Sequence, residues 1–267
     1  KNVGCDGAKS RLWGPLFSTY GCDVNPPVVL LDDATPGLER LLRFSHPSGV
    51  ISVSNPSQLP SAMAQVEEAL AAGRHVAGWM SYELDYAFEA CFLPRQWKEP
   101  AVPLLWFGIF DAPHPVEPAE LAAAGRAYAG PLRHEWDGRS YNERFARVHE
   151  YIAAGDIYQT NLSFRSRFAF VGDPLALYLQ LRGRAAAAHG AFIDDGVRQI
   201  LSLSPELFFA ITSDGRVTAR PMKGTAARGT DESSDVRAKT TLANSQKDRA
   251  ENLMIVDLLR NDLGRLA

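Results

Sequence analysis

Apolar residues in the first half of the chain recur in patterns that predict strands and a helix. A short apolar run at 28–31 predicts a buried strand, and two further strands are predicted at 75–84 and 104–110. Apolar residues spaced three and four apart over 63–70 predict a helix, which Gly73 would end. The first half therefore combines strands with a helix.

The second half has clearer patterns. Ser140 and Glu143 form the sequence S-x-x-E, which predicts a capping box at the start of a helix ending at Gly155. Apolar and polar residues alternate over 162–170, as in a half-buried strand. Asp173–Pro174 suits the start of another helix, which we expect to run to about residue 187.

The last third of the chain predicts a hairpin followed by helices. An Asp-Gly pair at 214–215 indicates a tight turn between two strands. The remaining elements are strands at 200–203, 207–211 and 217–220 and helices that start near 233 and 247. Helices segregated from antiparallel strands indicate an α+β fold. Three prolines in 111–118 suggest a connection, so we predict two regions, 1–118 and 133–267.

Composition narrows the class of protein. The chain has 267 residues, 46% apolar and 22% charged, with a formal net charge of −3, which is typical of a globular protein. It has no basic patch, and its apolar runs are shorter than a membrane helix needs, so we expect neither a nucleic-acid nor a membrane partner. Its three cysteines form no C-x-x-C pair, which favours a reducing, cytoplasmic location.

Candidate chemistry gathers near the predicted hairpin. Glu206 and Lys223 flank it, so the carboxylate and the amine are expected to end on neighbouring strands. A lysine acts as a nucleophile or base only when its pKa falls, and Glu206 could act as an acid or base. From spacing alone, solvated surface positions are the more common outcome for both residues, because charged side chains are rarely buried.

Two further groups lie close by in the sequence. Asp248 and Glu251 are three apart on one predicted helix, which suits either a Mg²⁺ site or interaction with the helix N-terminus. Gly224, Thr225 and Arg228 form a short loop whose backbone N–H groups could bind a carboxylate. The spacing alone leaves these alternatives open.

Four motifs, in this order, resemble the chorismate-utilising enzymes, a family that includes aminodeoxychorismate, anthranilate, isochorismate and salicylate synthases. They are GDIYQTNL at 155–162, SPELF at 204–208, RPMKGT at 220–225 and KDRAENLMIVDLLRNDLG at 247–264. GWMSYEL at 78–84 and PLLWFG at 103–108 extend the resemblance. The last of the four motifs and Lys223 most resemble aminodeoxychorismate synthase component I.

The resemblance implies a role for each candidate residue. Lys223 would attack the chorismate ring and expel its hydroxyl, and Glu206 would be the acid and base at that hydroxyl. Gly224, Thr225 and Arg228 would lie at the substrate. Glu251 would bind Mg²⁺, with Asp248 in the outer shell. A separate glutaminase subunit would supply ammonia for 4-amino-4-deoxychorismate, a precursor of 4-aminobenzoate and folate.

The implied fold is that of anthranilate synthase component I, two facing antiparallel sheets with outer helices. Because the family motifs continue beyond the last residue printed here, we expect an incomplete fold that is inactive by itself. The alternatives are an isochorismate or salicylate synthase, an anthranilate synthase component I, or a non-catalytic fragment that binds an aromatic ligand. For the last, residues 28–33 and 81–83 would lie near the ligand.

Overall fold

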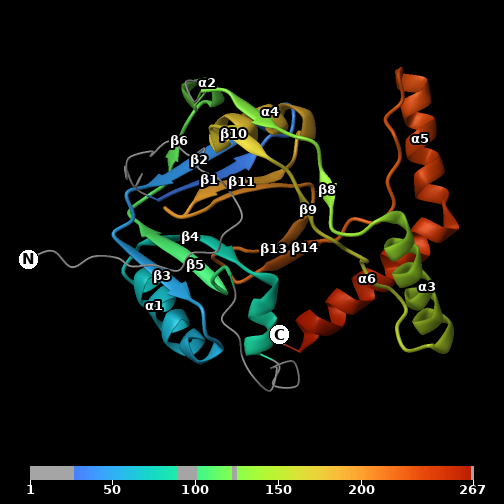
Figure 1. Cartoon of the computed structure of the whole chain (residues 1–267), viewed down its shortest axis with the longest axis horizontal. Helices are drawn as coiled ribbons and strands as arrows, with labels where there is room; N and C mark the ends of the chain where they lie inside the picture. The colour runs from blue at the N-terminus through green and yellow to red at the C-terminus, as the bar shows by residue number, and fades with distance from the viewer. Residues whose placement is uncertain (1–26, 89–100, 122–124, 266–267) are drawn as a thin grey trace, which may run out of the picture.

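The computed structural model describes residues 27–88, 101–121 and 125–265 and has an α+β fold (Figure 1). Every strand pair formed by these residues is antiparallel, which confirms the predicted class. The three cysteines lie outside the described ranges. Among the helices of the described part, none is both long and apolar enough to cross a membrane.

A five-stranded sheet joins strands from both halves of the chain. Its order is β12 (Gln199–Ser204), β11 (His189–Asp194), β1 (Val28–Asp33), β2 (Arg40–Ser45) and β6 (His114–Pro115). The apolar residues at 28–31 suit the central position of β1, because a strand with neighbours on both edges is mostly covered, and here Val29 and Leu30 are buried. The strand predicted at 28–31 is therefore confirmed and extends to Asp33.

A three-stranded sheet consists of β3 (Gly49–Val53), β5 (Leu105–Phe110) and β4 (His75–Met80). The strand predicted over 75–84 is wrong beyond Met80, because Met80 pairs with Leu105, the first residue of β5. The chain then forms the 3₁₀ helix η2 (Tyr82–Ala87). Pro103, which lacks an N–H, precedes this part of β5 and cannot extend the ladder.

Buried apolar clusters lie between the two sheets and on the outer face of each sheet. Val29 and Phe44 of the five-stranded sheet form one buried cluster with Trp106 and Phe110 of the three-stranded sheet. Helix α1 (Leu59–Ala71), which follows the short 3₁₀ helix η1 (Pro56–Gln58), packs on the other face of the three-stranded sheet. Helix α4 (Pro174–Ala185) packs on the other face of the five-stranded sheet, with α2 (Pro118–Leu121) beside it. The order of layers is therefore helix, sheet, sheet, helix.

Helix α3 (Gly138–Ala154) begins earlier than the sequence predicted. The capping box at Ser140 and Glu143 is wrong, because Asp137 is the N-cap and its carboxylate accepts the Ser140 backbone N–H at 2.8 Å. Asp caps a helix well, and its placement three residues before Ser140 shifts the start. The predicted end is confirmed, since Gly155 follows the helix with a φ of 79°.

The strand predicted over 162–170 is also wrong in extent. Only two short pieces are strands, β9 (Ser166–Arg167), paired with β8 (Arg133–His134), and β10 (Phe170–Gly172), paired with β7 (Ala127–Ala129). The alternation persists where no partner strand is present, so it does not form a ladder there. Phe164 instead stacks on the Trp136 ring, with 5.2 Å between ring centroids.

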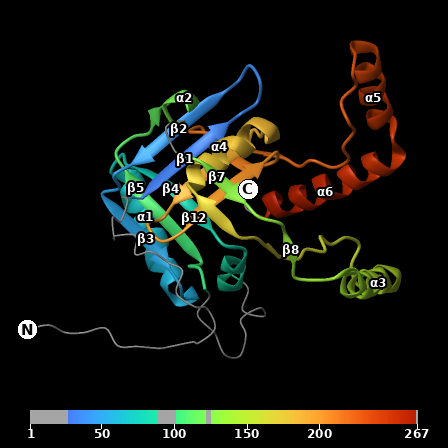
Figure 2. The ribbon, with the colours of Figure 1, turned by 45° about the horizontal axis from the view of Figure 1, so that its top comes forward.

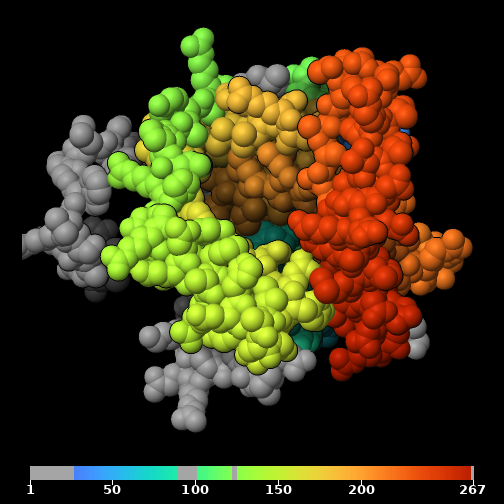
Figure 3. Space-filling model, turned by 90° about the vertical axis from the view of Figure 1, so that its right-hand side faces the viewer, coloured from blue at the N-terminus to red at the C-terminus, as the bar shows by residue number. Residues whose placement is uncertain are grey.

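The predicted hairpin and final helices are confirmed. Strands β13 (Leu207–Ile211) and β14 (Val217–Arg220) pair antiparallel, and helices α5 (Glu232–Asn244) and α6 (Gln246–Gly264) follow. Figures 1 and 2 show that α3, α5 and α6 lie on one side of the sheets. Figure 3 shows a hollow between the red helix α6 and the yellow-green helix α3.

Candidate active site

The hairpin brings Glu206 next to the lysine loop, as predicted. Ser204 turns the chain between β12 and β13, because its hydroxyl accepts the Glu206 backbone N–H and donates to the Glu206 carbonyl at 3.1 Å. The Glu206 carboxylate then accepts the backbone N–H of Met222 at 2.8 Å. The acid therefore binds the residue that immediately precedes Lys223.

Gly224 packs the lysine loop against the first turn of α6. Its φ is +69°, in the left-handed region that favours glycine. A Cβ at this position would lie 2.8 Å from both Cγ and Oδ1 of Asp248, closer than real contacts allow. Lys223 is half-buried beside this contact. The structure thus places the loop that carries Lys223 in contact with both Glu206 and Asp248.

Asp248 and Glu251 lie on one side of the N-terminal part of α6. Ser245 is the N-cap, and its hydroxyl accepts the Asp248 backbone N–H at 3.3 Å. Both acidic residues are half-buried. The described residues contain no group of three or more His, Cys, Asp or Glu arranged to hold a metal. Two carboxylates still suit Mg²⁺, which commonly takes its other ligands from water and an anionic substrate.

The side chain of Arg228 is bound to α5. Its guanidinium donates to the Asp235 carboxylate at 2.6 and 2.8 Å, and the Gly229 backbone N–H donates to the same carboxylate at 2.9 Å. The side-chain hydrogen bonds from Arg228, followed by the backbone bond, lower the pKa of Asp235. Arg228 therefore holds the loop on α5.

Asp235 was missed by sequence reasoning. It lies in the first turn of α5, where Asp231 is the N-cap. The available signal was the preference of acidic residues for a helix N-terminus, together with an arginine a few residues before. Thr225 lines a cavity of about 470 Å³ with residues of α5 and the start of α6, including Asp248.

The family model described as "chorismate binding enzyme" matches residues 111–267, more than half of the chain. The chain belongs to this family. The resemblance inferred from the four motifs is thus confirmed, and the matched range includes Glu206, Lys223 and Glu251.

Curated relatives of this family member include proteins with two different names. Aminodeoxychorismate synthase component 1 of Escherichia coli (strain K12) is 46% identical over 127 residues, which are 48% of this chain and 28% of the relative. The protein of that name from Klebsiella aerogenes is 39% identical over 173 residues, or 64% and 36%. Anthranilate synthase component 1 of Saccharolobus solfataricus is 39% identical over 127 residues, or 48% and 30%. The matched segments span about a third of these relatives.

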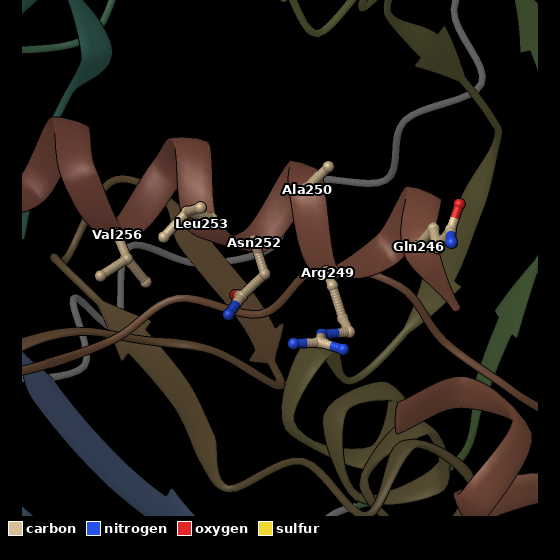
Figure 4. Close-up of a pocket in the computed structure, with 6 residues that line it drawn as sticks. All are labelled: Gln246, Arg249, Ala250, Asn252, Leu253 and Val256. Carbon is tan, nitrogen blue, oxygen red and sulfur yellow. The ribbon is translucent and has the colours of Figure 1, made fainter. Parts of the chain in front are cut away.

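A second cavity lies along α6. It has a volume of about 500 Å³ and is lined by residues between Gln246 and Val256. Figure 4 shows Arg249, Asn252 and Val256 extending from the same side of the helix. The residues that line it include neither Lys223 nor Glu206. This cavity is therefore not formed by the hairpin loop that carries Lys223.

The two segments expected near an aromatic ligand, 28–33 and 81–83, do not line the same cavity. Leu31 and Asp33 of β1 line a cavity of about 350 Å³ with Arg40 of β2. Residues 81–83 are not among those that line it. Asp32 also borders this cavity, but Tyr178 and Arg182 bind its carboxylate.

Proposed function

We propose that the protein acts as an aminodeoxychorismate synthase component I, which converts chorismate and ammonia to 4-amino-4-deoxychorismate and water for 4-aminobenzoate and folate synthesis. The observation that supports this most is Lys223 in a loop bound on one side by Glu206 and packed on the other against Asp248. The relatives named aminodeoxychorismate synthase reach 46% identity, against 39% for the anthranilate synthase described above.

Lys223 is the nucleophile of this proposal. Its neutral amine forms a C–N bond to the ring carbon that lies between the carboxylate-bearing carbon and the one that bears the side chain, both conjugated ring double bonds shift, and the bond to the hydroxyl breaks. Glu206 gives its proton to the departing oxygen, which leaves as water. The adjacent Met222 N–H, bound to Glu206 at 2.8 Å, fixes the position of this acid relative to the lysine.

Ammonia completes the exchange. It bonds to the carbon that lost the hydroxyl, both ring double bonds shift back, and the bond to Lys223 breaks with its electrons returning to the lysine nitrogen. Glu206 takes the proton that the new amine releases, so the enzyme returns to its first state. The net change is one hydroxyl replaced by one amine. In this proposal a separate glutaminase subunit supplies the ammonia.

Glu251 would hold Mg²⁺, which when bound neutralises a carboxylate of the dianionic substrate. Asp248 is proposed as its outer-shell neighbour, which is consistent with a carboxyl group packed on Gly224. Gly224 and Thr225 would contact the substrate. Arg228 is already bound to Asp235, so its proposed contribution to substrate binding is to position the loop.

The test uses the full-length gene product with chorismate, ammonium and Mg²⁺, and identifies products by mass spectrometry. We expect an aminated product, which Lys223→Ala abolishes. Lys247→Ala, a change at an exposed lysine at the start of α6, is expected to keep activity. A product of the same mass as chorismate would support an isochorismate synthase instead. Unchanged amination by Lys223→Ala would exclude the covalent lysine.

A further inference from the structure

A cavity of about 400 Å³ lies on the face of the five-stranded sheet that α4 covers. Its apolar lining includes Leu30, Leu121, Leu175 and Phe192. Side chains alternate between the faces of a strand, so Leu30 faces this cavity and the neighbouring Leu31 faces the cavity on the other side of the sheet. The α4-side cavity is therefore separate from that one and from the lysine loop.

Arg43 is the positive group of the α4-side cavity. On the central strand, Leu30 pairs with Arg43 of β2 on one edge and with Phe192 of β11 on the other. The three side chains therefore lie side by side on one face, with the arginine next to an apolar surface. The Nε of Arg43 is buried and has no hydrogen-bond partner among the residues that the structure describes. A buried donor without an acceptor is unfavourable, so a ligand that supplies an acceptor to the Arg43 Nε would be stabilised here.

Two carboxylates also border the cavity, and each accepts hydrogen bonds from neutral N–H groups. Asp173 is the N-cap of α4 and accepts the Leu175 backbone N–H at 2.8 Å. Asp194 accepts the Gly196 backbone N–H at 2.8 Å and the Gln199 side-chain amide at 3.1 Å. The ion pairs of the described residues include none between Arg43 and either carboxylate. The positive end of the α4 dipole adds a further preference for a negative group here.

We propose that the α4-side cavity binds a small monocarboxylate with an apolar aromatic or branched aliphatic body. The carboxylate accepts from Arg43, and the body packs on Leu30, Leu121 and Phe192. A volume of about 400 Å³ is within the range of small-molecule sites, which are mostly apolar with a few polar groups that orient the ligand. This site is independent of the chorismate chemistry proposed for Lys223.

The experiment measures binding of 3-phenylpropanoate to the full-length gene product by isothermal titration calorimetry. We expect a dissociation constant of about 1 mM or tighter, as a ligand of this size can reach. The uncharged 3-phenylpropan-1-ol, which has the same body, is expected to bind at least about tenfold more weakly, because it loses the charge-assisted bond to Arg43.

Variants assign the binding to this cavity. Arg43→Met keeps the apolar stem and removes the guanidinium, and we expect at least about a tenfold loss of affinity. Arg40→Met is the matched control, since Arg40 lies on the same strand and lines the other cavity. It is expected to leave binding unchanged. Leu175→Trp keeps Arg43 and fills the cavity, and it should also prevent binding.

Several results would overturn the proposal. They are no saturable binding of 3-phenylpropanoate to the parent protein, equal affinity for the acid and the alcohol, or equal affinity in a folded Arg43→Met variant. Loss of affinity in Arg40→Met alone would place the ligand in the other cavity. Circular dichroism checks that each variant is folded. None of these results depends on turnover of chorismate, so failure here leaves the proposed reaction untouched.

Discussion

Replacing Asp32 with Asn tests how much a buried ion pair stabilises the contact between β1 and α4. The Asp32 carboxylate accepts from Tyr178 at 2.9 Å and from two nitrogens of Arg182 at 2.7 and 3.0 Å. The side chains are only 1% exposed for Asp32 and 14% for Arg182. Removing the negative charge leaves a guanidinium in a poorly solvated place without its partner. We expect the free energy of unfolding to fall by about 3–5 kcal/mol.

The chain contains a matched control for this change. Arg228 and Asp235 form the same two-nitrogen geometry, at 2.6 and 2.8 Å, but their side chains are 87% and 30% exposed. Solvent and salt screen such a pair, so Asp235→Asn is expected to leave stability unchanged within error. The two ion pairs differ in burial far more than in bond geometry.

Urea unfolding followed by circular dichroism measures both effects. With an m-value of about 3 kcal/mol per molar, the expected loss lowers the midpoint of Asp32→Asn by about 1 M or more. The Asp235→Asn midpoint should coincide with that of the parent protein. Equal shifts in the two variants would refute the argument, because they would show that burial does not set the contribution of these pairs.

Two further predictions concern Gly224 and Tyr178. Gly224→Ala places a non-glycine residue in the left-handed region, which costs about 1–2 kcal/mol, and its Cβ displaces Asp248, so we expect lower stability and slower amination. The control Gly183→Ala, with open space around it, should be tolerated. Unchanged turnover of Gly224→Ala would show that the loop is not held by this contact. Burial, followed by the hydrogen bond to Asp32, raises the pKa of Tyr178, so its contribution to stability is full below about pH 10 and is lost as the pH rises above it. Unfolding measured from pH 8 to 11 should show a smaller alkaline loss in Tyr178→Phe than in the parent protein, and identical slopes would contradict this.

Local signals in the sequence were sufficient for the hairpin and several helix ends. The Asp-Gly turn placed β13 and β14 side by side, and with them Glu206 and the lysine loop. Asp173 and Gly155 mark a helix start and a helix end as predicted, because capping depends on the conformation of a few adjacent residues.

Features that depend on distant partners were not predictable. The alternation over 162–170 matches a strand, but most of that segment has no neighbour to pair with. The packing of Gly224 on Asp248 and the binding of Asp32 by Arg182 join residues far apart in the chain. A pattern of residue types specifies which face is apolar, and it does not specify which other segment will cover that face.

The position of β1 has a consequence for synthesis of the chain. Leu30 pairs with Phe192, roughly 160 residues later. At about 5–20 residues per second, a ribosome needs roughly 10–30 s between the two strands. During this interval β1 can form a hairpin with β2, but its other edge stays unpaired, and an unpaired apolar edge favours aggregation. We therefore expect the nascent chain to depend on chaperones until β11 has emerged.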